Sequence, residues 1–368
     1  MEFRFVEESM MQGSNSSVRN AFTVSEILSQ PETWRTCLHD LANDVSFQAA
    51  KKIAESRKSW LFVGCGTSFY LAEAAASCWK LLTGQPARAV PASEILLFPQ
   101  LVLGTGPDLQ AVIISRSGRT SEAVRAAELL SQKFKIPTLG ITCAPESELV
   151  KTCDLTIALP KADEESMVMT RSFSSMLLTL QKLAFEVAGT KHSSAILESV
   201  AKGLASKIEE WNSRTTNFVS QHTFEDYVYL AQGPFFPIAR EAALKVTEMS
   251  HSYAQAYHTL EFRHGPKSIV APQTCIAFLL SETAMQAETE VLLEMKDLGG
   301  TIIAICNRAN AKVRQASDLL FELETDVPEP ALLAPFVVPT QILGYQTGVK
   351  KGFNPDEPKN LSRVVILD

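Results

Sequence analysis

Short, fully apolar runs alternate with helical patterns along this chain, and the whole series occurs twice. In the first series the expected strands are residues 60–63, 111–115, 138–142 and 155–159. In the second series they are residues 226–231, 274–280, 301–306 and 318–323. Apolar strands that alternate with helices are typical of a parallel sheet covered by helices on both faces. The pattern therefore predicts two similar α/β domains that arose by duplication.

The domain boundaries follow from this repeat and from the helices around it. The main helices are expected near residues 121–132, 170–187, 284–298 and 335–350. We predict an N-terminal helical segment over residues 1–45, a first domain over 46–205, a second domain over 206–340, and the end of the last helix with a tail over 341–368.

Composition excludes several classes of protein. The net charge is −7 and the isoelectric point is near 5.5, whereas nucleic-acid-binding proteins usually present a basic surface. No stretch approaches about 18 consecutive apolar residues, so no membrane association is expected. The acidic start of the chain lacks a signal peptide's apolar segment, which favours a cytoplasmic location. The seven cysteines and six histidines lack metal-ligand spacing, so we expect no metal.

Two loops between a strand and a helix are rich in hydroxyl side chains. Residues 115–120 read Ser-Arg-Ser-Gly-Arg-Thr, and residues 64–68 read Gly-Cys-Gly-Thr-Ser. Hydroxyls and backbone N–H groups at a helix N-terminus suit a phosphate, although one such hydroxyl alone would be an ordinary helix cap. Neither loop has the dinucleotide-binding fingerprint, so a sugar phosphate is the expected ligand. The expected phosphate-binding residues are Thr67, Ser68, Ser115, Arg116, Ser117 and Thr120.

One predicted helix of the second half carries a stripe of charge. Glu241, Lys245 and Glu248 are spaced i, i+4 and i+7, so they share one helix face. For an arbitrary helix such a stripe is most often solvated. This helix directly follows the first strand of its domain, so its N-terminus should lie at the ligand edge of the sheet. His264 precedes a Gly-Pro turn, and a carboxylate with an imidazole would suit proton transfer beside a carbonyl.

The second half lacks a phosphate loop at the place that corresponds to residues 115–120. There the sequence is Ser281-Glu282-Thr283, with an acid where a phosphate would be repelled. We therefore expect the first domain to bind the phosphate and the second to supply acid–base groups.

These motifs resemble the double sugar-isomerase (SIS) domain family, which includes the isomerase half of glucosamine-6-phosphate synthase. The carriers of the resemblance are residues 65–68, 115–120, 241–248 and 263–266, in the family's order and spacing. The resemblance implies an α/β fold of two SIS domains, each a flavodoxin-like parallel sheet flanked by helices on both faces. It also implies a homodimer or higher homo-oligomer with shared active sites, to which His264 comes from the neighbouring subunit.

Further residue roles are implied by the same resemblance. Glu248 would move a proton between C1 and C2 of a hexose 6-phosphate, Lys245 would stabilise the developing oxyanion, and Glu241 would hold Lys245. Gly66, Thr170 and Arg363 would contact the substrate. Arg363 stands where the synthase has a tail lysine that forms an imine, which a guanidinium does not form because it stays protonated.

Residues 169–176 and 262–268 resemble the branch of aminosugar-phosphate deaminases and tagatose-6-phosphate ketose/aldose isomerases. The implied activity is isomerisation of a hexosamine 6-phosphate with release of ammonia. No organic cofactor is expected either, because this chemistry does not require one. Two alternatives stay open: a plain ketose/aldose 6-phosphate isomerase, and a non-catalytic regulatory protein that binds a sugar phosphate. The sequence leaves open whether the sugar is gluco or galacto.

Overall fold

Two parallel β-sheets of five strands each form the computed structural model, which describes residues 22–103 and 108–367. The first sheet has the order β2-β1-β3-β4-β5 and the second the order β7-β6-β8-β9-β10, so the two share one topology. This is the flavodoxin-like order, and the expected pair of α/β domains is confirmed. The strands are β1 (Ser59–Gly64), β2 (Ala87–Pro91), β3 (Leu109–Ile114), β4 (Thr138–Thr142), β5 (Leu155–Ala158), β6 (Asp226–Ala231), β7 (Tyr253–His258), β8 (Thr274–Leu279), β9 (Thr301–Cys306) and β10 (Leu319–Glu322).

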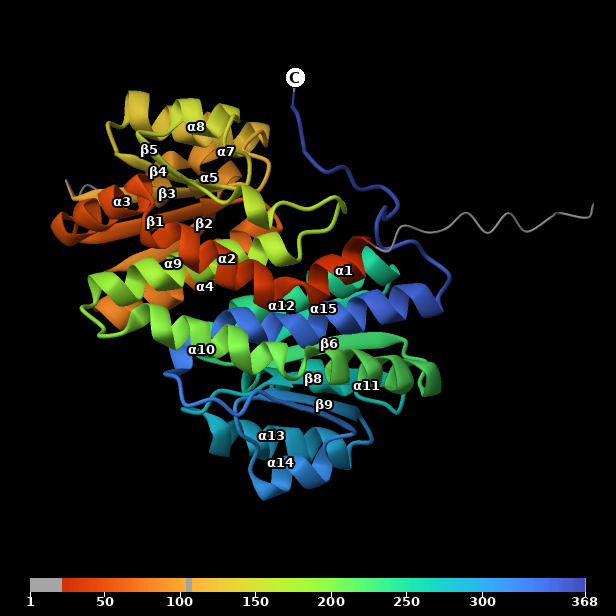
Figure 1. Ribbon diagram of the computed structural model, residues 1–368. Helices are drawn as coiled ribbons and strands as arrows, with labels where there is room; N and C mark the ends of the chain where they lie inside the picture. Colours follow the sequence, from red (N-terminus) through yellow and green to blue (C-terminus); the bar gives the residue numbers. More distant parts are fainter. Residues whose placement is uncertain (1–21, 104–107, 368) are drawn as a thin grey trace, which may run out of the picture.

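Helices cover the sheets and fill the space between them (Figure 1). None of the helices in the described ranges is both long and apolar enough to cross a bilayer. The helices are α1 (Phe22–Leu28), α2 (Gln30–Ala42), α3 (Val45–Ser56), α4 (Thr67–Thr83), α5 (Ala92–Leu97), α6 (Pro99–Val102), α7 (Ser121–Glu128), α8 (Glu148–Thr152), α9 (Arg171–Val187), α10 (Ser193–Ala205), α11 (Ile208–Gln221), α12 (Phe236–Ser250), α13 (Met285–Asp297), α14 (Ala311–Ala316) and α15 (Leu333–Lys350).

The two domains share one hydrophobic core. Helices α4 and α9 of the first half pack against α12 and α15 of the second half, in the layer between the two sheets (Figure 1). Buried side chains from both domains, such as Trp60 and Tyr229, belong to the same apolar cluster in this layer. Because burial of apolar surface is the dominant favourable term in folding, this common core holds the two halves in one arrangement.

Helix α12 lies unusually close to α15. Gly344 and Gly348 of α15 face α12, and a Cβ atom on Gly348 would lie 2.2 Å from the carbonyl oxygen of Met249. A Cβ atom on Gly344 would meet the carbonyl oxygen of Lys245 at 3.1 Å. These glycines therefore set the position of α12 relative to the rest of the second domain.

Two strands were not expected from the sequence. Strands β2 and β7 lie at one edge of their sheets and are largely half-exposed, so neither contains the buried apolar run that marks the inner strands. The helix expected over residues 121–132 is α-helical only to Glu128 and continues as a π-helical turn, Leu129–Lys133. The domain boundaries stay predictions.

Candidate active site

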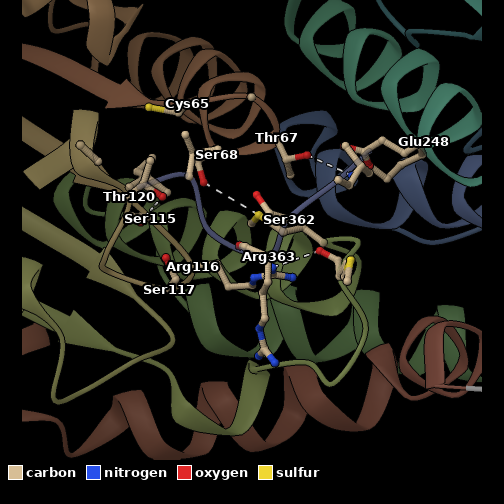
Figure 2. Close-up of a pocket in the computed structure, with 18 residues that line it drawn as sticks. Cys65, Thr67, Ser68, Ser115, Arg116, Ser117, Thr120, Glu248, Ser362 and Arg363 are labelled. Atoms are coloured by element: carbon tan, nitrogen blue, oxygen red, sulfur yellow. Dashed lines mark hydrogen bonds and ion pairs between the residues drawn. The ribbon is translucent and has the colours of Figure 1, made fainter. Parts of the chain in front are cut away.

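A cavity of about 230 Å³ lies between the two domains, at the carboxyl ends of β1 and β3 (Figure 2). Loops that follow these strands, the start of α4, the C-terminal half of α12 and the C-terminal tail surround it. The lining residues are Cys65, Gly66, Thr67, Ser68, Ile114, Ser115, Arg116, Ser117, Thr120, Ala123, Met167, Met169, Lys245, Glu248, Leu361, Ser362, Arg363 and Val365. This is the edge of a parallel sheet at which open α/β folds bind ligands.

The loop of residues 115–120 is compact because Gly118 has no Cβ atom and adopts a positive φ. Gly118 has a φ of 60°, and a Cβ atom there would lie 2.0 Å from the Ser147 hydroxyl oxygen. The Gly118 carbonyl accepts from the N–H of Leu149, which ties the loop to α8. Gly66, with a φ of 55°, similarly directs the other loop into α4. Both turns thereby bring helix N-termini to the cavity.

Hydroxyl groups gather at the end of the cavity formed by the first domain. The cavity is lined there by Ser68, Ser115, Ser117 and Thr120 (Figure 2). The Ser115 and Thr120 hydroxyl oxygens are 3.5 Å apart. Together with the N-terminus of α7, these donors can surround a phosphate dianion.

The side chain of Arg116 makes contacts that the sequence did not predict. Its Nη1 lies 3.2 Å from Glu164 Oε2, and its Nη2 donates to the carbonyl oxygens of Met167 and Arg363 at 3.0 and 3.3 Å. Arg116 and Glu164 are both buried. The guanidinium therefore joins the phosphate loop to the segment after β5 and to the C-terminal tail, although the residue also lines the cavity.

Thr170 lies outside the cavity that was expected to include it. Its N–H and its hydroxyl both donate to Glu164 Oε1, at 2.6 and 2.8 Å, and the side chain is fully buried. Its contacts support the buried Glu164 at the start of α9. The loop hydroxyls therefore lie together at the cavity, whereas Thr170 is buried outside it against Glu164.

Glu241, Lys245 and Glu248 of α12 form a buried charged cluster instead of a solvated stripe. Lys245 Nζ lies 2.6 Å from Glu248 Oε2 and 3.3 Å from Glu241 Oε1. Glu241 and Lys245 are fully buried, whereas the Glu248 side chain is 16% exposed and faces the cavity. Glu248 is therefore the carboxylate that a ligand can reach, and Glu241 lies behind the lysine.

Burial and neighbouring charges shift the pKa values of two groups in this cluster. Burial raises the pKa of Glu241 to about 8, against the attraction of Lys245. Burial acts to lower the pKa of Lys245, but attraction to Glu241 and Glu248 outweighs it and raises that pKa. At neutral pH the cluster therefore holds the Lys245 ammonium beside a protonated Glu241.

Thr67 connects this cluster to the first domain. Its hydroxyl oxygen accepts a hydrogen bond from Lys245 Nζ at 3.0 Å (Figure 2). Thr67 belongs to the first turn of α4, so the contact crosses the domain boundary. From the sequence Thr67 was expected to bind the phosphate, and only the packing of α4 against α12 shows its proximity to the ammonium.

The C-terminal tail covers the phosphate loop. The N–H of Ser121 donates to the carbonyl oxygen of Val365 at 3.2 Å, and Leu361 and Ser362 line the cavity. Arg363 also lines it, but its guanidinium pairs with Asp163 Oδ1 at 3.0 Å. Ser362, Met167 and Met169 also line the cavity and were not predicted as site residues, because only the tertiary structure brings their segments to this place.

His264 lies outside the cavity in the single chain. It is exposed and follows the 3₁₀-helix Glu261–Arg263, whose Arg263 pairs with Glu294 at 2.7 Å. The structure therefore brings Glu241, Lys245 and Glu248 to the loop hydroxyls, but not His264.

Comparison with known proteins identifies relatives along most of the chain. The SIS domain model matches residues 52–185 and 225–343. Glutamine–fructose-6-phosphate aminotransferase (isomerizing) of Pseudomonas aeruginosa is 26% identical over 94% of this chain. The match covers 59% of that enzyme, so this chain spans about three-fifths of such relatives.

Solved structures show the same fold. Glucosamine-6-phosphate deaminase of Thermotoga maritima is 30% identical, with a TM-score of 0.75 over 94% of this chain and 99% of that one. Tagatose-6-phosphate ketose/aldose isomerase of Escherichia coli is 24% identical, with a TM-score of 0.81 over 92% of this chain and 95% of that one. The second likeness concerns the fold alone.

The protonation of Glu241 predicts a pH effect on stability. Its folded pKa of about 8 exceeds the ordinary value of 4.5, so the stability from its protonated form is complete below pH 4.5 and is lost as pH rises to 8. Glu241→Gln, which cannot ionise, should unfold with a Tm that falls less over this interval than the wild-type Tm. Glu210→Gln, at an exposed ion pair on α11, is the control and should follow the wild type. Parallel curves for Glu241→Gln and wild type would contradict the assignment.

The contact between Thr67 and Lys245 predicts a loss of turnover. Thr67→Val keeps the shape but removes the acceptor, and a hydrogen bond to a charged group contributes roughly 1.5–3 kcal/mol. We expect kcat for a phosphosugar to fall by about 10- to 100-fold. Thr67→Ser should restore most of it because the hydroxyl returns. A rise in KM at constant kcat would instead assign Thr67 to ground-state binding.

Proposed function

The chain belongs to the SIS domain family, and from that premise we propose that it is a phosphosugar isomerase that acts on a hexosamine 6-phosphate and releases ammonia. One observation carries the proposal: hydroxyl groups at a helix N-terminus and the Lys245–Glu248 pair line the same cavity. The first group suits a phosphate and the second suits proton transfer at a carbon beside a carbonyl. The similarity to a glucosamine-6-phosphate deaminase and to an isomerizing glutamine–fructose-6-phosphate aminotransferase supports this reading.

The phosphate fixes the sugar in the cavity. Ser68, Ser115, Ser117 and Thr120 donate to the 6-phosphate, far from the reacting carbons. This anchoring orients C1 and C2 towards α12 and converts the proton transfer into a step within one complex.

Glu248 moves a proton between C2 and C1. Its carboxylate takes the proton from C2, and the C1 oxygen becomes negative as the enolamine forms. Lys245, only 2.6 Å from Glu248, stabilises that oxygen or supplies its proton, while Thr67 and Glu241 hold the ammonium in place. Return of the proton to C1 completes the isomerisation without a metal or an organic cofactor.

Deamination follows from the amine at C2. Protonation of the enolamine at C1 leaves a C2 imine, and water adds to that imine and releases ammonia. The products are a ketose 6-phosphate and ammonia. With a hydroxyl at C2, the same proton transfer gives a ketose without ammonia.

His264 serves the site of a neighbouring copy in this proposal. The closed hexosamine ring needs a proton moved between O1 and O5, and His264 is exposed and outside its own chain's cavity. The catalytic unit is then a homodimer or a higher homo-oligomer.

A substrate panel tests the proposed reaction. Hexose and hexosamine 6-phosphates of the gluco and galacto series are incubated with the protein, and ammonia and ketose are measured separately. Both products should appear from a hexosamine 6-phosphate. Ketose without ammonia would establish a plain isomerase, and binding without turnover of any sugar would establish a regulatory protein.

Glu248→Gln should lower kcat by about 100- to 10,000-fold because the amide cannot accept the C2 proton. Its affinity for the phosphosugar should stay near the wild-type value, since the phosphate contacts are intact. Titration calorimetry and turnover of the same preparation measure both. Wild-type turnover in Glu248→Gln would remove Glu248 from the mechanism.

Subunit mixing tests the shared site. Glu248→Gln and His264→Ala chains, each inactive alone, should regain activity when they exchange subunits, because one site of each hybrid dimer carries neither change. Random pairing gives up to roughly a quarter of wild-type activity. Mass spectrometry of tagged chains verifies the exchange. Hybrids without activity would contradict the role of His264 in trans.

A further inference from the structure

The loop after β8 in the second domain corresponds to the phosphate loop after β3 in the first. Strand β3 ends at Ile114 and β8 ends at Leu279, so Arg116 and Ser281 each lie two residues beyond their strand. Each loop leads into a helix, α7 or α13. The sequence suggested that the second loop repels anions because it contains Glu282.

The side chain of Glu282 does not enter this loop. Its Oε1 accepts from Asn307 Nδ2 at 2.7 Å, whereas its backbone N–H donates to Glu329 Oε1 at 2.6 Å. The hydroxyls of Ser281 and Thr283 donate to the same carboxylate, at 2.6 and 2.7 Å. The Thr283 N–H adds a longer contact of 3.4 Å. Two hydroxyls and two backbone N–H groups therefore surround one carboxylate.

The first domain has a glutamate in the corresponding segment, but it is bound differently. Glu164 follows β5 as Glu329 follows β10, and its Oε2 pairs with Arg116 of the loop at 3.2 Å. Its other oxygen accepts from Thr170. Glu164 is thus neutralised behind the loop, and the hydroxyls of Ser115 and Ser117 line the cavity. At the place of Arg116 the second domain has Ser281, which is a donor to the carboxylate and carries no charge.

Glu329 also lies at a junction of the molecule. It begins the 3₁₀-helix η6 (Glu329–Leu332), which leads into α15. The carbonyl oxygen of the next residue, Pro330, accepts from Gln181 Nε2 of α9 at 2.6 Å. The carboxylate therefore fastens the second sheet to the segment that contacts the first domain.

We propose that the loop of residues 281–283 is an oxyanion-binding site whose resident anion is the carboxylate of Glu329. This site holds a carboxylate of its own chain where its counterpart in the first domain is open to a phosphate. Each chain then has one site for a phosphosugar, and removal of the Glu329 side chain creates a site for a small carboxylate from solution.

A small monoanion is the suitable probe because Glu288 lies behind the loop. Glu288 accepts from the N–H of Ser281 at 2.8 Å and from Thr259 at 2.9 Å. A second negative charge on the probe would be repelled there. Formate matches the carboxylate of Glu329 in shape and charge.

Chemical rescue tests the proposal. Glu329→Ala should lower the Tm by several degrees, and sodium formate should restore most of that loss, whereas sodium chloride at equal ionic strength should not. The change in the wild-type Tm with formate serves as the control for formate that acts at other sites. In the triple variant Glu329→Ala/Ser281→Ala/Thr283→Val the rescue should disappear, because the hydroxyl donors are gone. Equal effects of formate on wild type and Glu329→Ala would overturn the proposal.

A second measurement uses chains that keep Glu329. Inorganic phosphate titrated into the wild type should bind to at most one site per chain, and Ser117→Ala/Thr120→Ala should weaken that binding. The proposal would be overturned if a second phosphate bound per chain. Its affinity would have to be unaffected by Ser117→Ala/Thr120→Ala and lost in Ser281→Ala/Thr283→Val, which would show that the second loop is open. This result is separate from the proposed reaction, which concerns turnover at the first domain's loop.

Discussion

The ammonium of Lys245 is fully buried, and this constraint organises the centre of the molecule. A buried charge is tolerated only with partners of opposite charge and with hydrogen bonds. Glu248 pairs with the ammonium at 2.6 Å from the same helix, Glu241 Oε1 lies 3.3 Å from it, and Thr67 supplies an acceptor from the other domain. Because the partners come from both halves of the chain, the pairing of this lysine and the docking of the two domains depend on each other.

The helices around this ammonium explain how it stays in place. Helix α12 is held against α15 by the close approach at Gly348, and against α4 by the core that both domains share. Helix α4 begins directly after the loop that follows β1. In its first turn, Thr67 accepts a hydrogen bond from Lys245 and Ser68 lines the cavity. A displacement of α12 would therefore disturb acid–base groups and anion donors together.

Two copies of one topology have developed different loops. In the first domain, Arg116 holds Glu164 and the tail, so that the hydroxyls nearby line the cavity. In the second domain an uncharged serine stands at that place, and Glu329 binds the loop itself. A single change of charge two residues after a strand thus accompanies the difference between a loop that can receive a ligand and a loop that is part of the scaffold.

The sequence by itself determined the two parallel sheets, the two hydroxyl-rich loops and the common face of Glu241, Lys245 and Glu248. Each of these is a local property, since buried strands, helix N-termini and helix faces follow from residues within a few positions of one another. Tertiary structure alone decided that the charged face is buried, that Arg116 binds Glu164, that Thr170 lies behind the cavity, and that Glu329 occupies the second loop. These facts depend on contacts between distant segments, which periodicity does not encode because it describes one element at a time.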